Sequence, residues 1–227
     1  MQITELFHSV QGEGKYAGTP SVFVRTTGCN LRCWFCDTPY TSWEPEGSRR
    51  SWESVRDQVL AYDCEHVVIT GGEPLLQAEV GPLTRTLHDA GRFITIETAG
   101  TVLLPVYADL MSISPKRPNS TPWERDKEWA LRHEATRDNL DTLRSLTAEY
   151  PYQLKYVVDQ PEDIADVDAH IATISGIEPD RVYLMPQGVV AEELATRMTW
   201  IKAAAAERNY RVSPRLHIEL FGNVRGT

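Results

Sequence analysis

Six short segments rich in β-branched and aromatic residues recur along the chain, and amphipathic helical patterns separate most of them. The segments are Ser21–Thr26, His66–Thr70, Phe93–Glu97, Leu110–Ser114, Gln153–Val158 and Arg181–Met185. Strands that alternate with helices favour a parallel sheet with the helices outside it. About six such units predict an α/β fold, an incomplete (β/α)6-type barrel, which carries its chemistry at the carboxyl ends of the strands.

Four amphipathic patterns predict the outer helices, because their apolar residues recur every three or four positions. The apolar sets are Trp52, Val55 and Val59; Leu76, Val80, Leu83 and Leu87; Ile164, Val167, Ile171 and Ile174; and Leu194, Met198, Ile201 and Ala205. Ser51 can cap the first of these helices. Gly91 and Gly176 are stop signals after the second and third.

Two regions interrupt the alternation within what we expect to be a single domain over residues 1–227. Residues 117–129 are rich in Pro, Trp and mixed charge, which predicts an irregular insertion that leads to a helix around Ala135–Tyr150. This insertion spans about residues 117–150. For Leu216–Thr227 we expect a final strand and a tail.

The composition limits the class of partner. With 23 basic and 32 acidic residues the formal net charge is −9, which argues against nucleic-acid binding and favours a small-molecule substrate. No stretch approaches the ~20 apolar residues that span a bilayer, so no membrane association is expected. The first residues lack the features of a secretory signal, and a cytoplasmic location is the default expectation.

Three of the four cysteines lie within eight residues, directly after the first predicted strand, at Cys29, Cys33 and Cys36. A four-iron cluster held by three thiolates leaves one iron open for a chelating cofactor. A structural zinc ion is the alternative, and it would need a fourth ligand from a distant residue such as His66 or Cys64. Otherwise Cys64 is expected to be a buried bystander.

Two further motifs end predicted strands. In Thr70-Gly71-Gly72-Glu73-Pro74, paired glycines allow a ligand to approach the backbone and the carboxylate can accept from an ammonium group. The second motif is Glu97-Thr98-Ala99-Gly100-Thr101. A simple turn is the alternative interpretation of each.

The CxxxCxxC spacing, with Phe35 before the third cysteine, resembles the radical S-adenosylmethionine superfamily. The resemblance implies that the three cysteines bind a [4Fe-4S] cluster and that S-adenosylmethionine chelates its open iron. Reductive cleavage of this cofactor then supplies the radical that abstracts a substrate hydrogen. The Gly-Gly-Glu motif resembles the element that holds the cofactor's amino group. The second motif resembles another cofactor element, except that Ala99 stands where the family usually has Asn.

Nearly end to end, the chain resembles the 7-carboxy-7-deazaguanine synthase family of queuosine biosynthesis. The motifs are Val10-Gln11-Gly12-Glu13-Gly14, Cys36-Asp37-Thr38, Ser114-Pro115-Lys116 and Met185-Pro186-Gln187-Gly188. The resemblance implies ring contraction of 6-carboxy-5,6,7,8-tetrahydropterin with loss of ammonia, a Mg²⁺ ion, a homodimer and an electron donor such as flavodoxin or ferredoxin. It is weakest over residues 117–149 and in the tail.

The family resemblance also implies roles for single residues, none of them catalytic beyond the cluster and the cofactor. Cofactor contacts are implied for Phe35, Cys36, Asp37, Gly72, Glu73, Glu97, Ser114, Pro115, Lys116, Met185, Pro186, Gln187 and Gly188. Substrate contacts are implied for Val10, Gln11, Gly12, Arg25, Thr70 and Thr227. Thr38 matches the magnesium ligand, with a loop-capping hydroxyl as the alternative. For Arg25, Lys116 and Glu97 the alternatives are an exposed strand residue, a solvated lysine and a turn carboxylate; His217 is expected to be structural.

Two rival functions remain open. A glycyl-radical-enzyme activase would share the cysteine motif and the small size, but it would not need Gln11, Arg25 or Thr38 at these positions. A non-catalytic zinc-binding module would contain zinc and no iron.

Overall fold

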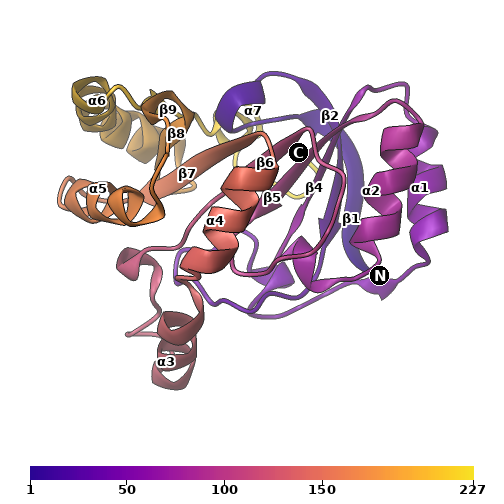
Figure 1. Cartoon of the computed structure of the whole chain (residues 1–227), viewed down its shortest axis with the longest axis horizontal. Helices are drawn as coiled ribbons and strands as arrows, with labels where there is room; N and C mark the ends of the chain where they lie inside the picture. The colour runs from indigo at the N-terminus through magenta and orange to yellow at the C-terminus, as the bar shows by residue number, and fades with distance from the viewer.

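The computed structural model describes all 227 residues, and its centre is one nine-stranded sheet in the order β3-β1-β2-β4-β5-β6-β7-β8-β9. The strands are β1 Gln2–Val10, β2 Pro20–Thr26, β3 Ser48–Arg49, β4 His66–Gly71, β5 Phe93–Thr98, β6 Leu110–Ile113, β7 Tyr152–Val158, β8 Val182–Pro186 and β9 Arg211–Val212. All neighbours from β2 to β9 are parallel. The sheet is curved (Figure 1). It stays open because its edge strands, β3 and β9, do not pair with each other, as expected for an incomplete barrel.

Alternation along the parallel strands decides which side chains face the helices. In β4, Val67 and Ile69 belong to the hydrophobic core, whereas Thr70 lines a cavity on the other face. In β5, Ile94 and Ile96 point to the core and Glu97 to the cavity. Successive strand residues point to opposite faces, so the sheet has one apolar face for packing and one polar face for chemistry. Burial of each large apolar side chain stabilises the fold by about 1.5–3 kcal/mol.

The helices are α1 Trp52–Leu60, α2 Val80–Asp89, α3 Lys127–Thr136, α4 Leu140–Glu149, α5 Asp163–Ile174, α6 Ala191–Arg208 and α7 Leu216–Phe221. Most of them cover the outer face of the sheet, but α3 projects away from it and α7 contributes His217 to the cavity (Figure 1). Ser51 caps α1 as predicted, because its side chain accepts from the Ser54 N–H. Gly91 follows α2 with a φ of +75°, a conformation that suits glycine. Leu76 is not part of α2; it lies in the 3₁₀ turn Pro74–Leu76 and is exposed.

Three parts of the chain differ from the sequence-based expectation. Strand β1 was not predicted, and it pairs antiparallel with β2, so the sheet is not wholly parallel. The insertion contains α3 in addition to the expected helix, and residues 118–120 form a 3₁₀ turn. Residues 216–221 form α7 and not a strand; the Leu216 N–H donates to the Gly12 carbonyl, and Ile218 is the buried residue of the helix. The expected final strand is therefore wrong, and the segment packs beside residue 12 as a helix.

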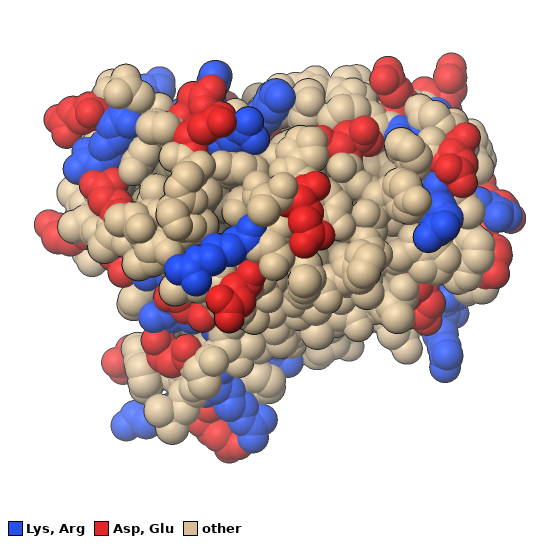
Figure 2. Space-filling model, in the orientation of Figure 1, with Lys and Arg blue, Asp and Glu red and all other residues tan.

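Charged side chains of both signs are interspersed on the face that Figure 2 shows, where a broad uncharged area covers the centre. None of the helices combines the length and the apolar character needed to cross a bilayer. In the same orientation, α3 projects at the lower left, away from the sheet (Figure 1).

Candidate active site

A cavity of about 460 Å³ lies on the polar face of the sheet, toward the carboxyl ends of the parallel strands. Its walls come from β2, β4, β5, β6, β7 and β8 and from the loops that follow most of them. Residues 10–13, Arg215, His217 and the tail from residue 223 also line it. Cavities of this size take small molecules, and the carboxyl ends of parallel strands are their usual place.

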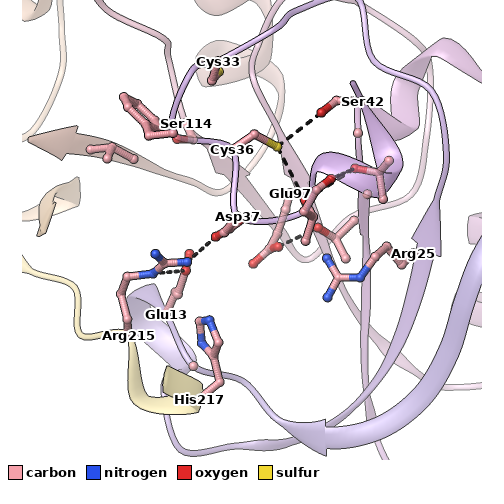
Figure 3. Close-up of a pocket in the computed structure, with 18 of the residues that line it drawn as sticks. Glu13, Arg25, Cys33, Cys36, Asp37, Ser42, Glu97, Ser114, Arg215 and His217 are labelled. Atoms are coloured by element: carbon pink, nitrogen blue, oxygen red, sulfur yellow. Dashed lines mark hydrogen bonds and ion pairs between the residues drawn. The ribbon is translucent and has the colours of Figure 1, made fainter. Parts of the chain in front are cut away.

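The three clustered cysteines line this cavity together, and Figure 3 shows two of them, Cys33 and Cys36. The Cys29 sulfur accepts from the Leu31 N–H at 3.4 Å, and the Cys36 sulfur lies 3.3 Å from the Ser42 hydroxyl. Burial raises the pKa of Cys29 and Cys33 to about 12. Both therefore remain thiols at neutral pH until a metal displaces their protons.

These thiols fit a multi-iron cluster better than a single ion. No three His, Cys, Asp or Glu side chains converge closely enough to hold one metal ion. A [4Fe-4S] cluster binds each cysteine through a different iron, so its thiolates surround a cavity and need not meet at a point. Three cysteines around one cavity supply the donor set that such a cluster needs.

The proposed distant zinc ligands lie at the other end of the sheet. His66 begins β4, and it pairs with Ser21 near the start of β2. The cysteine loop follows the end of β2, roughly 17 Å of strand away. Cys64 is part of the hydrophobic core, and its thiol faces the carbonyls of Pro20 and His66 at 3.4 Å. Neither residue can complete a zinc site with the cysteine loop, so that form of the alternative is wrong.

The two glycines at the end of β4, Gly71 and Gly72, allow the chain to pass close to the cysteine loop. Gly71 has a φ of +140°, and a side chain on Gly72 would lie 2.3 Å from the Gly28 carbonyl oxygen. The Glu73 N–H donates to that carbonyl at 2.9 Å. This backbone packing brings Gly72 to the cavity wall directly beside the cysteine loop.

Glu73 itself is fully buried and does not line the cavity, which differs from the expectation of a cofactor contact. Its carboxylate accepts from the Thr98 hydroxyl and the Ala99 N–H at 2.8 Å, and from the Leu75 N–H at 3.1 Å. Burial raises the pKa of Glu73, although these hydrogen bonds favour the charged form. In this structure Glu73 ties the end of β4 to the end of β5.

Glu97 joins two residues for which the sequence predicts substrate contacts. One carboxylate oxygen accepts from the Gln11 amide at 3.1 Å, and the other accepts from the Thr70 hydroxyl at 2.8 Å. The Lys155 ammonium lies 3.9 Å away. Glu97 is therefore a fixed acceptor on the cavity wall, in contact with the predicted substrate residues.

An ion-pair network that the sequence did not predict forms the cavity floor (Figure 3). Glu13 pairs with Lys155 and with Arg215, and Arg215 also pairs with Asp37 and donates to the Gly188 carbonyl. Burial alone would raise the pKa of Glu13, but Lys155 and Arg215 outweigh it and hold that pKa well below its usual value. The network links the cysteine loop, the loop after β8 and the segment after β1.

One signal for this network is visible in the strand pattern. Lys155 stands inside a predicted buried strand, and a buried ammonium requires a counter-charge; Glu13 belongs to a motif already noted. Arg215 and His217 had no such signal. His217 lines the cavity, and a side chain on Gly12 would lie 1.9 Å from its Nδ1. Position 12 must therefore be glycine for this packing.

Arg25 and Thr38 both face the cavity. The Arg25 Nε–H donates to Glu5 at 2.8 Å, so the guanidinium has a partner outside the cavity, and its terminal nitrogens point inward (Figure 3). The Thr38 side chain makes no capping bond to the turn that follows it. Its hydroxyl lies 3.4 Å from the Thr41 hydroxyl and 3.8 Å from the Cys36 sulfur, directly beside the cysteine loop.

The predicted cofactor contacts also gather at this cavity, with exceptions. The cavity is lined by Phe35, Asp37, Ser114, Lys116, Met185, Gln187 and Gly188. The Lys116 ammonium is not free in solvent, because it donates to the Ser114 hydroxyl at 2.7 Å and to the Ser114 carbonyl at 3.0 Å. Pro115 and Pro186, like Glu73, do not line the cavity. All predicted substrate contacts do, including Val10, Gln11 and Gly12.

The tail takes part in the cavity lining, through residues 223–225 and Thr227. The Arg225 guanidinium stacks 3.6 Å from the centre of the Tyr40 ring and pairs with Glu46 at 3.0 Å. Tyr40 in turn donates to Glu5 at 3.2 Å. These contacts hold residues 223–227 against the turn after the cysteine loop.

Comparison with known proteins agrees with this geometry. The profile of the Radical SAM superfamily matches residues 23–171. The chain is 44% identical to the 7-carboxy-7-deazaguanine synthase of Halobacterium salinarum, over 100% of this chain and 93% of that protein. It is 45% identical to the synthase of Rhodopirellula baltica, over 99% and 88%.

A solved structure shows the same fold. The crystal structure of QueE from Escherichia coli superposes with a TM-score of 0.72 at 26% identity, covering 95% of this chain and 94% of that one. Family membership implies a [4Fe-4S] cluster and S-adenosylmethionine, and the three cavity thiols fit that cluster. By its sequence and its fold, the chain belongs to the radical S-adenosylmethionine superfamily and, within it, to the 7-carboxy-7-deazaguanine synthase family.

Proposed function

We propose that this chain converts 6-carboxy-5,6,7,8-tetrahydropterin to 7-carboxy-7-deazaguanine with loss of ammonia, as a step of queuosine biosynthesis. One observation carries the proposal: the three thiols of the CxxxCxxC motif and the Gln11–Glu97–Thr70 set line the same cavity. A radical formed from a cofactor bound at a cluster on these thiols would arise within reach of a small polar heterocycle. The cluster and S-adenosylmethionine supply the one-electron cleavage that starts the reaction.

The proposed cofactor side is the wall between the cysteine loop and the ends of β4, β6 and β8. Cys29, Cys33 and Cys36 would hold the iron. The backbone at Gly72 can approach a ligand closely because it carries no side chain. Further proposed contacts are Phe35, Asp37, Ser114, Lys116, Met185, Gln187 and Gly188. Glu73 would act from behind this wall, because it fixes the turn and does not face the cavity.

The proposed substrate side is the part of the cavity wall formed by residues 10–12, Thr70 and Glu97. A pterin presents ring N–H groups and an amino group, which suit the carboxylate acceptor of Glu97. Its carboxylate suits Arg25, because a planar guanidinium can donate two parallel hydrogen bonds to it. Thr227 lines the same cavity and is a proposed contact.

A magnesium ion is part of the proposal. Thr38 lines the cavity and its hydroxyl makes no capping bond, so it is placed to offer oxygen to a hard cation. One hydroxyl, substrate oxygens and waters would form a typical magnesium shell, since Mg²⁺ keeps several waters. The ion would orient the substrate carboxylate while the ring rearranges.

The remaining parts of the proposal concern partners. We propose a homodimer, a cytoplasmic location, and an electron donor of the flavodoxin or ferredoxin type. The substrate is a small molecule; neither nucleic acid nor a membrane has a role.

Anaerobic turnover tests the proposed function against an activase. Reconstituted protein, dithionite, S-adenosylmethionine, Mg²⁺ and 6-carboxytetrahydropterin should give 7-carboxy-7-deazaguanine, detected by its mass, without any partner protein. Absence of this product, while S-adenosylmethionine is still cleaved, would contradict the proposal and favour a protein substrate.

A further inference from the structure

The insertion between β6 and β7 packs against the back of the cysteine loop. The Trp34 N–H donates to the Ser120 carbonyl at 3.1 Å, and the Trp34 indole N–H donates to the Asn119 carbonyl at 2.7 Å. The Arg32 guanidinium lies 4.1 Å from the centre of the Trp129 ring. The insertion therefore contacts the loop between each pair of cysteines, at residues 32 and 34.

His133 is the innermost side chain of this contact. It lies on α3 and is fully buried. Its Nδ1 lies 3.1 Å from the Arg32 backbone nitrogen, which can only donate, so Nδ1 is the unprotonated ring nitrogen. Nε2 then carries the proton and donates to the Ser120 hydroxyl at 2.9 Å. That hydroxyl donates onward to the Arg117 carbonyl at 2.7 Å.

The rest of α3 gives the protein little packing. Its buried residues are Ala130 and His133, while Leu131 is largely exposed. A ten-residue helix has little stability of its own in water. Its contacts with the cysteine loop, through His133 and Trp129, are thus a main reason for α3 to dock where it does.

The Arg32 amide matters because of its position in the chain. It lies between Cys29 and Cys33, and the Leu31 N–H already faces the Cys29 sulfur. A buried N–H without an acceptor is costly, so the acceptor of Arg32 restricts how the loop can lie. The Arg32 side chain also donates to the carbonyls of Cys29 and Leu31, at 2.7 and 2.8 Å.

We propose that His133 is a positioning residue for the iron–sulfur cluster: as acceptor for the Arg32 amide, it holds the loop so that the three thiols keep their places. The inference rests on the proposed cluster ligands but not on the identity of the substrate. His133 does not line the cavity, so it touches neither cofactor nor substrate.

Two substitutions separate the acceptor from the bulk of the ring. In His133→Asn the side-chain oxygen can replace Nδ1 as acceptor, whereas His133→Leu fills the space without an acceptor. His170 supplies a matched control, because it is also buried and uses both ring nitrogens, bonding Tyr156 at 2.8 Å and Asp138 at 3.1 Å. It makes no contact with the cysteine loop, so His170→Leu reports general destabilisation.

The experiment is the rate of iron release from each holoenzyme to an anaerobic chelator, with deuterium exchange of the peptide containing residues 29–36. His133→Leu should release iron on the order of tenfold faster than the wild type and exchange this peptide faster, because the partly buried Arg32 amide has lost its acceptor. His133→Asn and His170→Leu should stay within about twofold to threefold of the wild type.

Three outcomes would overturn the inference. The first is iron release from His133→Leu at the wild-type rate. The second is release from His133→Asn as fast as from His133→Leu. The third is release from His170→Leu as fast as from His133→Leu. If His133→Leu alone loses iron rapidly while the wild type makes no deazaguanine product, the positioning role stands and only the proposed reaction fails.

Discussion

The two ends of the inner sheet face are built from different residue types and serve different purposes. At the amino end, the rings of Tyr16, His66 and Phe93 pack together with centres 4.7 to 5.5 Å apart, and Tyr16 meets the other two edge to face. At the carboxyl end, Arg25, Glu97 and the cysteine loop surround the cavity. The first end is closed by aromatic packing, and the second is left open and charged.

Two cysteines, one at each end of the sheet, show how position and not burial decides the role of a residue. Cys33 and Cys64 have the same exposed fraction, 9%. Cys33 lies beside two other thiols at the cavity, whereas Cys64 lies in the hydrophobic core at the amino end of β4. Burial therefore does not distinguish a metal ligand from a structural thiol here. The end of the strand from which the residue projects does distinguish them.

The largest expected effect concerns these cysteines. Replacing Cys29, Cys33 or Cys36 with Ala should abolish cluster-dependent cleavage of S-adenosylmethionine, because each thiol holds a different iron. Cys64→Ala should retain iron and activity. Iron content and the visible absorbance of anaerobically reconstituted protein give the measurement. Equal iron loss from Cys64→Ala would contradict the three-ligand assignment.

The next effect concerns buried charge. Lys155→Met should lower the free energy of unfolding by about 3–5 kcal/mol, because it leaves Glu13 buried with only Arg215 as partner. Arg181→Met, which removes an exposed ion pair with Glu178 at the amino end of β8, should cost less than about 1 kcal/mol. Chemical denaturation of both variants measures the difference; equal losses would show that the floor network is not structural.

The ion-pair network also makes the free energy of unfolding depend on pH. The folded-state pKa of Glu13 lies well below 4.5, its usual value. The unfolded state therefore binds more protons in acid, so the stabilisation is complete above about pH 4.5 and is lost as the pH falls below it. Lys155→Met should flatten this acid limb of the stability curve. A limb as steep as in the wild type would contradict the assignment to Glu13.

Substrate binding should distinguish two arginines. Arg25→Ala should weaken pterin binding by about 2 kcal/mol or more while S-adenosylmethionine still binds, because the charge-assisted pair with the substrate carboxylate is lost. Arg92→Ala is the control, since Arg92 donates to the Cys64 and Tyr62 carbonyls at the amino end. Calorimetry that finds pterin affinity unchanged in folded Arg25→Ala protein would refute the role.

The smallest expected effect concerns magnesium. After exhaustive chelation, added Mg²⁺ should raise wild-type turnover, and Thr38→Val should blunt that response by a few-fold while the cluster stays assembled. The other ligands come from substrate and water, which is why the loss is partial. Metal-response curves that coincide for the two proteins would leave Thr38 without this role.

The parallel strands and most outer helices could be predicted from the sequence, because buried β-branched runs and apolar spacing are local signals. The cysteine motif is also a local signal, because its three residues lie within eight positions. The antiparallel β1 and the ion-pair network were not predictable in this way. Glu13, Lys155 and Arg215 meet only after the chain has folded, and their partners are up to 202 positions apart. Glu73 shows the converse: its motif was visible, but its three hydrogen bonds turn it away from the cavity.

The central claim is that the radical and the substrate meet in one cavity at the carboxyl end of the sheet. The most direct measurement uses 6-carboxytetrahydropterin deuterated at its saturated ring carbons, under anaerobic turnover, with mass spectrometry of S-adenosylmethionine and 5′-deoxyadenosine. We expect deuterium to pass from the substrate into the cofactor as 7-carboxy-7-deazaguanine forms. Cleavage of S-adenosylmethionine that proceeds with no deuterium transfer from the pterin would contradict the account.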